Sequence, residues 1–156
     1  ADPLEPGPAA RVVLNGRVLD GEEEPIADAV LEFWQADSAG DYLVPPARSH
    51  SRGFLRVFTD ADGCFRLTSI KPGPVREVNG SIQAPHLAVT ILMRGLLRRV
   101  TSRVYFPDEP ANAYDPILNQ VPSERRGTLI AHATTGDTLH WDIHMQGPHE
   151  TVFFEF

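Results

Sequence analysis

Hydrophobic and polar residues alternate along this chain in short segments that are separated by proline and glycine. The 14 prolines and 12 glycines are spread over the whole length, and the segments between them are rich in branched and aromatic side chains. Short alternating segments bounded by turn-forming residues are typical of β-strands. The pattern predicts strands at residues 11–19, 28–35, 54–59, 64–70, 86–93, 98–105, 139–146 and 151–154.

Short turns join two pairs of these strands and predict two β-hairpins. Asp60-Ala61-Asp62-Gly63 lies between the strands at 54–59 and 64–70, and its small acidic residues and glycine favour a tight turn. Arg94-Gly95 lies in the same way between the next two strands.

One segment, residues 123–130, has the features of a short helix. Ser123 is a residue type that can cap the amino terminus, and Arg125 and Arg126 fall on the exposed side, although Gly127 weakens the helix. Many short strands at this spacing, with one short helix, predict an all-β fold in the form of a two-sheet β-sandwich.

Three segments break the strand pattern. Residues 71–85 are too rich in proline and glycine to pair in a sheet, and residues 43–53 also connect two strong strands. Both are expected to be long loops at one end of the sandwich, where binding residues and plain surface connections are both common. Residues 1–10 contain three prolines and predict an extended arm, which leaves residues 11–156 as the β-sandwich domain.

Composition and charge narrow the classes of protein. A chain of 156 residues that is 42% hydrophobic can bury one core without disulfides or metal, and Cys64 is its single cysteine. The net charge of −7 has the wrong sign for binding phosphates, so neither nucleic acid nor an anionic membrane surface is expected as a partner. Because neither a membrane-spanning run nor a signal-peptide pattern is visible, we expect a cytoplasmic protein.

Two groups of polar residues invite a chemical interpretation. His86 opens a strand after Pro85 and could be a metal ligand or base, but Ala88 occupies the next position on its face, which favours a hydrogen-bonded strand-end histidine. His140, Asp142 and His144 share one face of the last long strand and suggest a metal triad. Same-face neighbours lie about 6.8 Å apart on a regular strand, so a polar face, or one covered by another chain, is favoured.

Several longer motifs resemble those of the intradiol ring-cleaving dioxygenases, in the same order and over residues 12–156. This resemblance implies a non-haem ferric enzyme family in which two tyrosinates and two histidines hold the iron. The motifs are Leu31-Glu32-Phe33-Trp34-Gln35-Ala36-Asp37, Ile70-Lys71-Pro72-Gly73-Pro74, Ala84-Pro85-His86-Leu87, Arg103-Val104-Tyr105-Phe106, Ser123-Glu124-Arg125-Arg126 and Glu150-Thr151-Val152-Phe153-Phe154.

Important positions depart from the catalytic pattern of that family. Val75 stands where a ligand tyrosine follows Lys-Pro-Gly-Pro, Ala88 replaces the second histidine of the His-X-His pair, and Gln83 replaces an arginine. Tyr42 is a weak match to the other tyrosine because it follows Ala39-Gly40 closely. With at most two of four ligands left, the chain is predicted to hold no metal and no catalytic residues of its own.

The resemblance then implies an iron-free α subunit that pairs with a homologous β chain carrying Fe(III). The shared pocket takes 3,4-dihydroxybenzoate, an aromatic small molecule, which O₂ cleaves to 3-carboxy-cis,cis-muconate. Arg94 matches an α-chain arginine that faces the substrate, and its guanidinium could bind the carboxylate. The alternative is a stand-alone β-sandwich binding module that has lost the chemistry. Some of four aromatic side chains are expected to cover a permanent partner surface, and the alternative is that all four belong to the core. The four residues are Trp34, Tyr105, Phe153 and Phe154.

Overall fold

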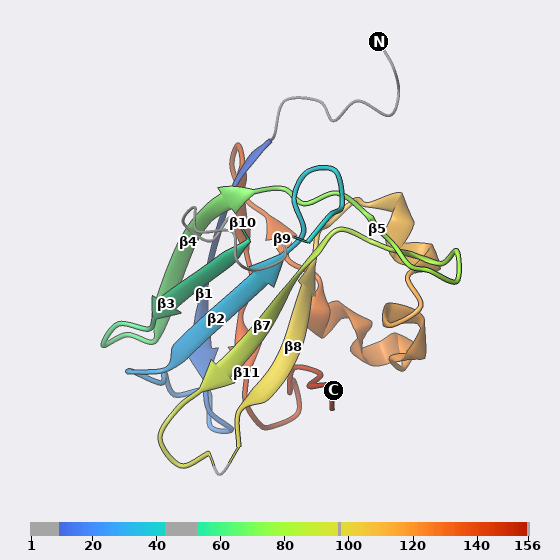
Figure 1. Cartoon of the computed structure of the whole chain (residues 1–156). Coiled ribbons are helices and arrows are strands. Elements are labelled where there is room, and N and C mark those ends of the chain that lie inside the picture. Colours follow the sequence, from blue (N-terminus) through green and yellow to red (C-terminus); the bar gives the residue numbers. More distant parts are fainter. Residues whose placement is uncertain (1–9, 43–52, 97, 156) are drawn as a thin grey trace.

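Two β-sheets pack face to face in the computed structural model, which describes residues 10–42, 53–96 and 98–155 (Figure 1). The front sheet has the order β3-β2-β7-β8, and the back sheet is built around β1, which pairs with β4, β10 and β11. The strands are β1 (Arg11–Leu19), β2 (Val30–Gln35), β3 (Phe54–Phe58), β4 (Cys64–Ile70), β5 (Val75–Arg76), β6 (Ile82–Gln83), β7 (His86–Leu92), β8 (Val100–Tyr105), β9 (His132–Ala133), β10 (Thr138–His140) and β11 (Ile143–His144). The two-sheet sandwich predicted from the sequence is confirmed.

The core lies between the two sheets and consists of the inward-facing residues of each strand. In β2, Leu31 and Phe33 are buried, while Glu32 and Trp34, which alternate with them, face outward, as a period of two requires. Strand β7 alternates in the same way, with Val89 and Ile91 fully buried. The main cluster of buried side chains is Val12, Leu14, Val18, Leu31, Phe33, Phe65, Leu67, Leu87, Val89, Ile91, Val104, Phe106, Ala131, Trp141, Ile143 and Met145.

The last long strand is broken, which corrects the continuous strand predicted at 139–146. β10 and β11 both run parallel to β1, but between them the Trp141 carbonyl presses against Gly16. A Cβ at Gly16 would lie 1.7 Å from the Trp141 oxygen, so only glycine fits there. The Trp141 amide instead donates to the Asn15 carbonyl, 2.8 Å away. The break changes which side chains can meet near His140.

The turn at residues 60–63 is tight, as predicted, but its two strands do not form a hairpin. The Gly63 amide donates to the Asp60 carbonyl at 3.0 Å, and Gly63 has φ +72°. β3 nevertheless pairs with β2, whereas β4 pairs with β1 along its full length, so the turn connects the two sheets. The predicted hairpin is therefore wrong, while the second one, β7 with β8, is confirmed.

Two further segments differ from the prediction. Residues 71–85 do pair in a sheet, since β5 and β6 form a two-residue antiparallel ladder. Residues 151–154 make only a single bridge, in which the Phe154 amide donates to the Thr101 carbonyl at 2.8 Å. Short ladders of this kind leave too little alternation for a sequence pattern to reveal.

The predicted helix is present as the 3₁₀ helix η3 (Ser123–Leu129), preceded by η1 (Pro110–Tyr114) and η2 (Leu118–Gln120). The capping position is Pro122, without a side-chain cap, so Ser123 does not have the predicted role. Arg126 is half-buried and its guanidinium donates to the Val121 and Asn119 carbonyls, which corrects its predicted exposure. Beneath these helices lies a second cluster, made of Ala84, Tyr105, Leu118, Val121, Leu129 and Val152.

Two predicted segments lie largely outside the described residues. These are the arm at 1–10, of which only Ala10 is described, and the loop at 43–53, of which only Gly53 is described. In the described part of the chain, no helix is long and apolar enough to cross a membrane.

Candidate functional site

The imidazole of His86 is the centre of a polar cluster at the first residue of β7. His86 is almost fully buried, and its Nδ1 lies 2.8 Å from the Ala84 carbonyl. Because a carbonyl only accepts, Nδ1 carries the proton and Nε2 presents its lone pair. The hydroxyl of Tyr42 lies 3.5 Å from this Nε2, a long contact in which the hydroxyl is the donor. His86 and Tyr42, the two possible metal ligands that remain in the sequence, therefore do lie close together.

A tight turn after β2 brings Tyr42 to this position. The Asp37 carboxylate accepts the amides of Ala39 and Asp41, both at 2.9 Å, and so closes the turn. Gly40 has φ +86°, and a Cβ there would lie 2.0 Å from the Pro74 carbonyl oxygen. This close approach joins the turn to the Lys-Pro-Gly-Pro segment, so that Tyr42 and the start of β5 are fixed relative to each other.

The position of the missing tyrosine, Val75, lies in β5 directly opposite Gln83 in β6. The Gln83 amide nitrogen donates to the Glu77 carboxylate, and its oxygen accepts from Arg103 Nη1 at 2.8 Å. Gln83 thus links an acidic side chain to a guanidinium from β8. Catalytic members of the family that the sequence resembles carry an arginine at the position of Gln83. In this chain the guanidinium beside Gln83 belongs to Arg103 of β8.

Arg103 stands directly opposite Ala88 in the pairing of β7 with β8. The hairpin predicted around Arg94-Gly95 put these two strands side by side, but it did not fix which residues lie opposite each other. The role of Arg103 was not identified from the sequence, where its only signal is its place in the Arg103-Val104-Tyr105-Phe106 motif.

A buried carboxylate that was not identified from the sequence stabilises the cluster. Asp115 is fully buried and accepts four hydrogen bonds, from the Tyr105 hydroxyl at 3.0 Å and from the amides of Ala84, Ile117 and Leu118 at 2.8–2.9 Å. These bonds tie η2 and β8 to the residue whose carbonyl orients His86. The carboxylate is a structural element of the site.

Burial and the nearby guanidinium set the protonation states. Burial, and next the positive charge of Arg103, lower the pKa of His86 to about 4, against smaller raising effects of the Ala84 carbonyl and Asp115. Burial raises the pKa of Tyr42, and the charge of Arg103 opposes this only in part. Burial and then Asp115 raise the pKa of Tyr105. Near neutral pH the cluster therefore holds a neutral imidazole and two neutral phenols.

These residues do not fit a ferric centre. One imidazole nitrogen and one phenol converge, while Val75 and Ala88 offer only carbon atoms. Burial raises the pKa of Tyr42, which opposes the tyrosinate that ferric iron requires. Among the described residues, no group of three or more His, Cys, Asp or Glu side chains is arranged to hold a metal ion.

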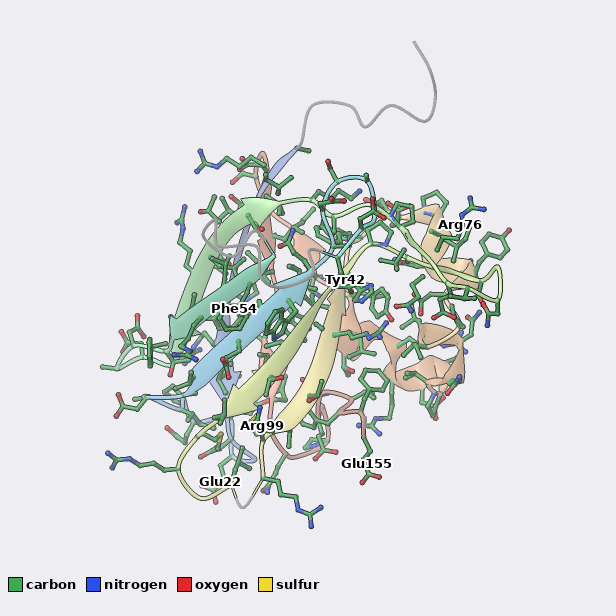
Figure 2. The ribbon with its side chains drawn as sticks, viewed as in Figure 1. Glu22, Tyr42, Phe54, Arg76, Arg99 and Glu155 are labelled. Carbon is green, nitrogen blue, oxygen red and sulfur yellow. The ribbon has the colours of Figure 1, made fainter. Side chains whose placement is uncertain are left out.

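Arg94 lies at the other end of β7, in the turn before β8, and its side chain is exposed. Seven residues of extended chain span roughly 20 Å, so Arg94 cannot contact the cluster around His86. Figure 2 shows this separation, with Tyr42 at one end of the front sheet and Arg99, from the same loop as Arg94, at the other.

The polar residues at the end of the chain form a separate group. The strand break lets the Asp142 carboxylate reach His140 Nε2 at 2.8 Å, closer than the regular strand assumed in the sequence analysis allows. His140 Nδ1 lies 2.7 Å from Asn15 Oδ1, so both ring nitrogens face oxygen atoms. His140 and Asp142 line a surface hollow of about 280 Å³. His132, His144 and His149 line the same hollow. A polar face, or one covered by another chain, stays the prediction for this group.

Sequence comparisons identify relatives of this chain. Residues 2–147 match the model of a family described as dioxygenase. The chain is 46% identical over 154 residues to the protocatechuate 3,4-dioxygenase alpha chain of Burkholderia cepacia, covering 92% of this chain and 76% of that one. It is 38% identical to the alpha chain of Pseudomonas putida, covering 96% and 78%. The protocatechuate 3,4-dioxygenase beta chain of Burkholderia cepacia is 32% identical to this chain, and the match covers 82% of this chain and 58% of the beta chain.

The fold is similar to that of a solved structure. The crystal structure of 3-chlorocatechol 1,2-dioxygenase from Rhodococcus opacus 1CP superposes with a TM-score of 0.72 over 92% of this chain and 61% of that one, at 22% sequence identity. The motifs, the sandwich and the matched relatives are consistent with one another. The chain belongs to the intradiol dioxygenase family.

Proposed function

We propose that this chain is the iron-free α subunit of a protocatechuate 3,4-dioxygenase and pairs with a homologous β chain that holds the ferric iron. The complex cleaves 3,4-dihydroxybenzoate between its two hydroxyl-bearing carbons, and both atoms of O₂ enter the product, 3-carboxy-cis,cis-muconate. The iron of the β chain supplies the oxygen chemistry. The similarity to two alpha chains and to a beta chain supports this assignment.

The observation that carries the proposal is the incomplete ligand set around His86. A chain that kept the fold but offers only His86 and Tyr42 as donors needs another chain for the chemistry. Its homologue with a full ligand set is the natural source, because related sandwiches with matching edges can pack as a pseudo-symmetric pair. In that pair this chain shapes the pocket and does not react.

Arg94 supplies the substrate contact of this chain. Its guanidinium is exposed at the end of the sandwich opposite to His86, so it is free to act on a pocket built by the partner. A guanidinium binds a carboxylate through two parallel hydrogen bonds, which suits the carboxylate of the aromatic substrate. Arg94 therefore selects for a substrate that carries this group.

The outer face of the front sheet is a surface suited to a permanent partner. Trp34 is 51% exposed and its ring centroid lies 4.3 Å from that of Phe54, while Phe58 on the same face is 64% exposed. Of the four aromatic residues predicted for this role, Tyr105 is fully buried in the core and Phe153 and Phe154 are partly buried. Trp34 remains as the one suited to a partner.

Co-expression with a β chain tests the proposal. We expect the co-purified pair to be coloured, to hold about one iron per pair and to take up O₂ with 3,4-dihydroxybenzoate, while this chain alone is colourless and inactive. Arg11→Gln, a change in an exposed ion pair on β1 of the back sheet, is the control and should assemble normally. A chain that stays monomeric and joins no intradiol β chain would indicate the stand-alone binding module instead, and tightly bound iron in the chain alone would indicate an enzyme in its own right.

The remaining sequence predictions belong to this proposal. A single domain at residues 11–156, a cytoplasmic location and the absence of nucleic-acid and membrane partners stay predictions. Fractionation of cells that express the tagged chain, with nuclease and membrane wash steps, would test the location and the partners.

A further inference from the structure

A surface hollow of about 460 Å³ lies on the back sheet, with a lining that comes from β1, β4, β10 and the end of β3. It lies beside the turn at residues 60–63, which Figure 1 shows between β3 of one sheet and β4 of the other. In β1 and β4 alternate residues belong to the core, so Arg17 and Arg66 point to the outer face of the sheet. Hollows of roughly 300–1,000 Å³ are of the size that binds small molecules.

Strand register brings two arginines together in this hollow. Arg66 of β4 lies directly opposite Asn15 of β1, and Arg17 lies opposite Cys64. Arg17 and Arg66 are therefore diagonal neighbours on one face, about 7–8 Å apart. At this spacing their long side chains can bind one oxyanion between them, and in its absence the two positive charges repel each other.

The chain itself neutralises neither guanidinium. Arg17 is half-buried and Arg66 is exposed, and within residues 10–42, 53–96 and 98–155 neither side chain has an ion pair or a hydrogen bond. The carboxylate in the lining, that of Asp60, accepts the amides of Asp62 and Cys64 at 2.9 Å and so stabilises its own turn.

The other polar groups around the hollow are also engaged. Asp142 Oδ1 accepts the backbone amide of Arg17 at 3.0 Å and lies 2.8 Å from His140 Nε2. Asn15 Oδ1 lies 2.7 Å from His140 Nδ1. The two guanidinium groups are therefore the free hydrogen-bond donors of the described lining, and a ligand has to supply the acceptors.

We propose that this hollow binds a small aromatic carboxylate, with Arg17 and Arg66 on the carboxylate and Phe58 against the ring. A guanidinium binds a carboxylate through parallel hydrogen bonds, and a half-buried arginine is screened less than one in water. Phe58 is 64% exposed and lines the same hollow, so it offers an apolar surface to a ring. This site is separate from the cluster around His86 and requires neither iron nor a β chain.

Cys64 allows a test at the site itself, because it is the single cysteine of the sequence and lines the hollow. The full chain reacts with a neutral aromatic disulfide, dithiodipyridine, and absorbance gives the rate of Cys64 modification at increasing concentrations of benzoate. We expect saturating benzoate to slow the reaction at least about 5-fold, because the bound ligand blocks access to the thiol. The concentration dependence gives the Kd for benzoate.

Variants of the lining show which side chains bind the ligand. Arg17→Gln and Arg66→Gln should each raise the Kd for benzoate about 10- to 100-fold, since each removes a charge-assisted contact. Phe58→Ala should raise it less, by about 3-fold. Arg11→Gln is the matched control, because it removes another arginine of β1 outside the hollow and should leave the Kd unchanged. Circular dichroism checks folding, and if Arg17→Gln does not fold, the comparison uses Arg66→Gln at the exposed position.

Two further probes separate the charge from the ring. Phenol has the ring without the carboxylate and should not protect Cys64, and phosphate has the charge without the ring and should protect it only weakly. Protection by phosphate as strong as that by benzoate would overturn the aromatic ligand class. Absence of protection by benzoate, or an unchanged Kd in both arginine variants, would overturn the site. These outcomes leave the proposed function standing, since that function depends on iron and on assembly with a β chain.

Discussion

The two ends of β7 have opposite characters in this protein. At His86 the chain is buried, and its polar groups are satisfied by Ala84, Gln83, Arg103 and Asp115 within the same molecule. At Arg94 the side chain is exposed. In the proposed function, the His86 end of β7 is a buried centre without chemistry, and Arg94 at the other end contacts the substrate of the partner chain. The two roles are independent in that proposal, because the two ends share only the backbone between them.

The largest expected effect is at the inward end, on replacing the buried carboxylate. Asp115→Ala leaves the Tyr105 hydroxyl and three amides without their acceptor, so we expect a loss of about 3–5 kcal/mol in the free energy of unfolding. Urea denaturation at pH 7 measures this loss. Arg94→Ala is the matched control and should change stability by less than about 0.5 kcal/mol. Similar losses in both variants would show that the two ends are not different in kind.

The second effect is the pH dependence of the inward end. Because the pKa of His86 falls from 6.5 to about 4 on folding, protonation favours the unfolded chain. The contribution is fully present above pH 6.5 and is lost as the pH falls towards 4, in total about 3 kcal/mol. Urea denaturation between pH 7 and 4 measures it, and His86→Gln should flatten the profile while replacement of the exposed His132 should not. An unchanged slope in His86→Gln would place the pH dependence elsewhere.

The third effect concerns the outward end and appears only in the assembled enzyme. Arg94→Ala should raise KM for 3,4-dihydroxybenzoate about 10- to 100-fold, because a charge-assisted hydrogen bond contributes about 1.5–3 kcal/mol. Catechol, which lacks the carboxylate, should be affected much less, and iron content should not change. Arg94→Lys should recover part of the loss, since it keeps the charge without the planar two-point contact. Equal losses for both substrates would indicate a role in assembly, and no loss for either would leave an ordinary surface arginine.

The smallest effect is expected between the two ends. Arg56 and Glu32 form an ion pair at 3.0 Å midway along β3 and β2, at one edge of the front sheet, with the arginine side chain 56% exposed. Arg56→Gln should cost less than about 1 kcal/mol, and the cost should decrease in high salt. Thermal denaturation at two salt concentrations is sufficient to detect it. A larger loss of stability would mean that this ion pair contributes more to the fold than an exposed pair usually does.

The elements that the sequence predicted most accurately are those that depend on local alternation. The bounds of β1 and β4 agree with the prediction residue for residue, because both strands have an uninterrupted pattern and clear flanking turns. The pairing of β3 was wrong because a tight turn fixes only the direction of the chain, while the sheet that each strand joins depends on packing across the core. The split between β10 and β11 likewise depends on the contact of Trp141 with Gly16, which are far apart in sequence.

The functional site divides in a similar way. Val75, Ala88 and Gln83 were identified from motifs, because a missing donor is visible in the sequence without any geometry. Tyr42 was considered a weak match, yet the turn closed by Asp37 and Gly40 carries its hydroxyl to His86. Arg103 and Asp115 were not identified at all, since their roles come from strand register and from a buried carboxylate among 3₁₀ turns.

The sequence by itself thus determined the sandwich, the family and the lack of two ligands, because strand formation and side-chain chemistry are local properties of the chain. Only the tertiary structure decided which groups fill the resulting space. Opposite positions in β7 and β8 bring Arg103 beside Ala88, and burial then sets the charge states of His86 and Tyr42. Long-range register and desolvation are properties of the packed chain, so no pattern along the sequence contains them.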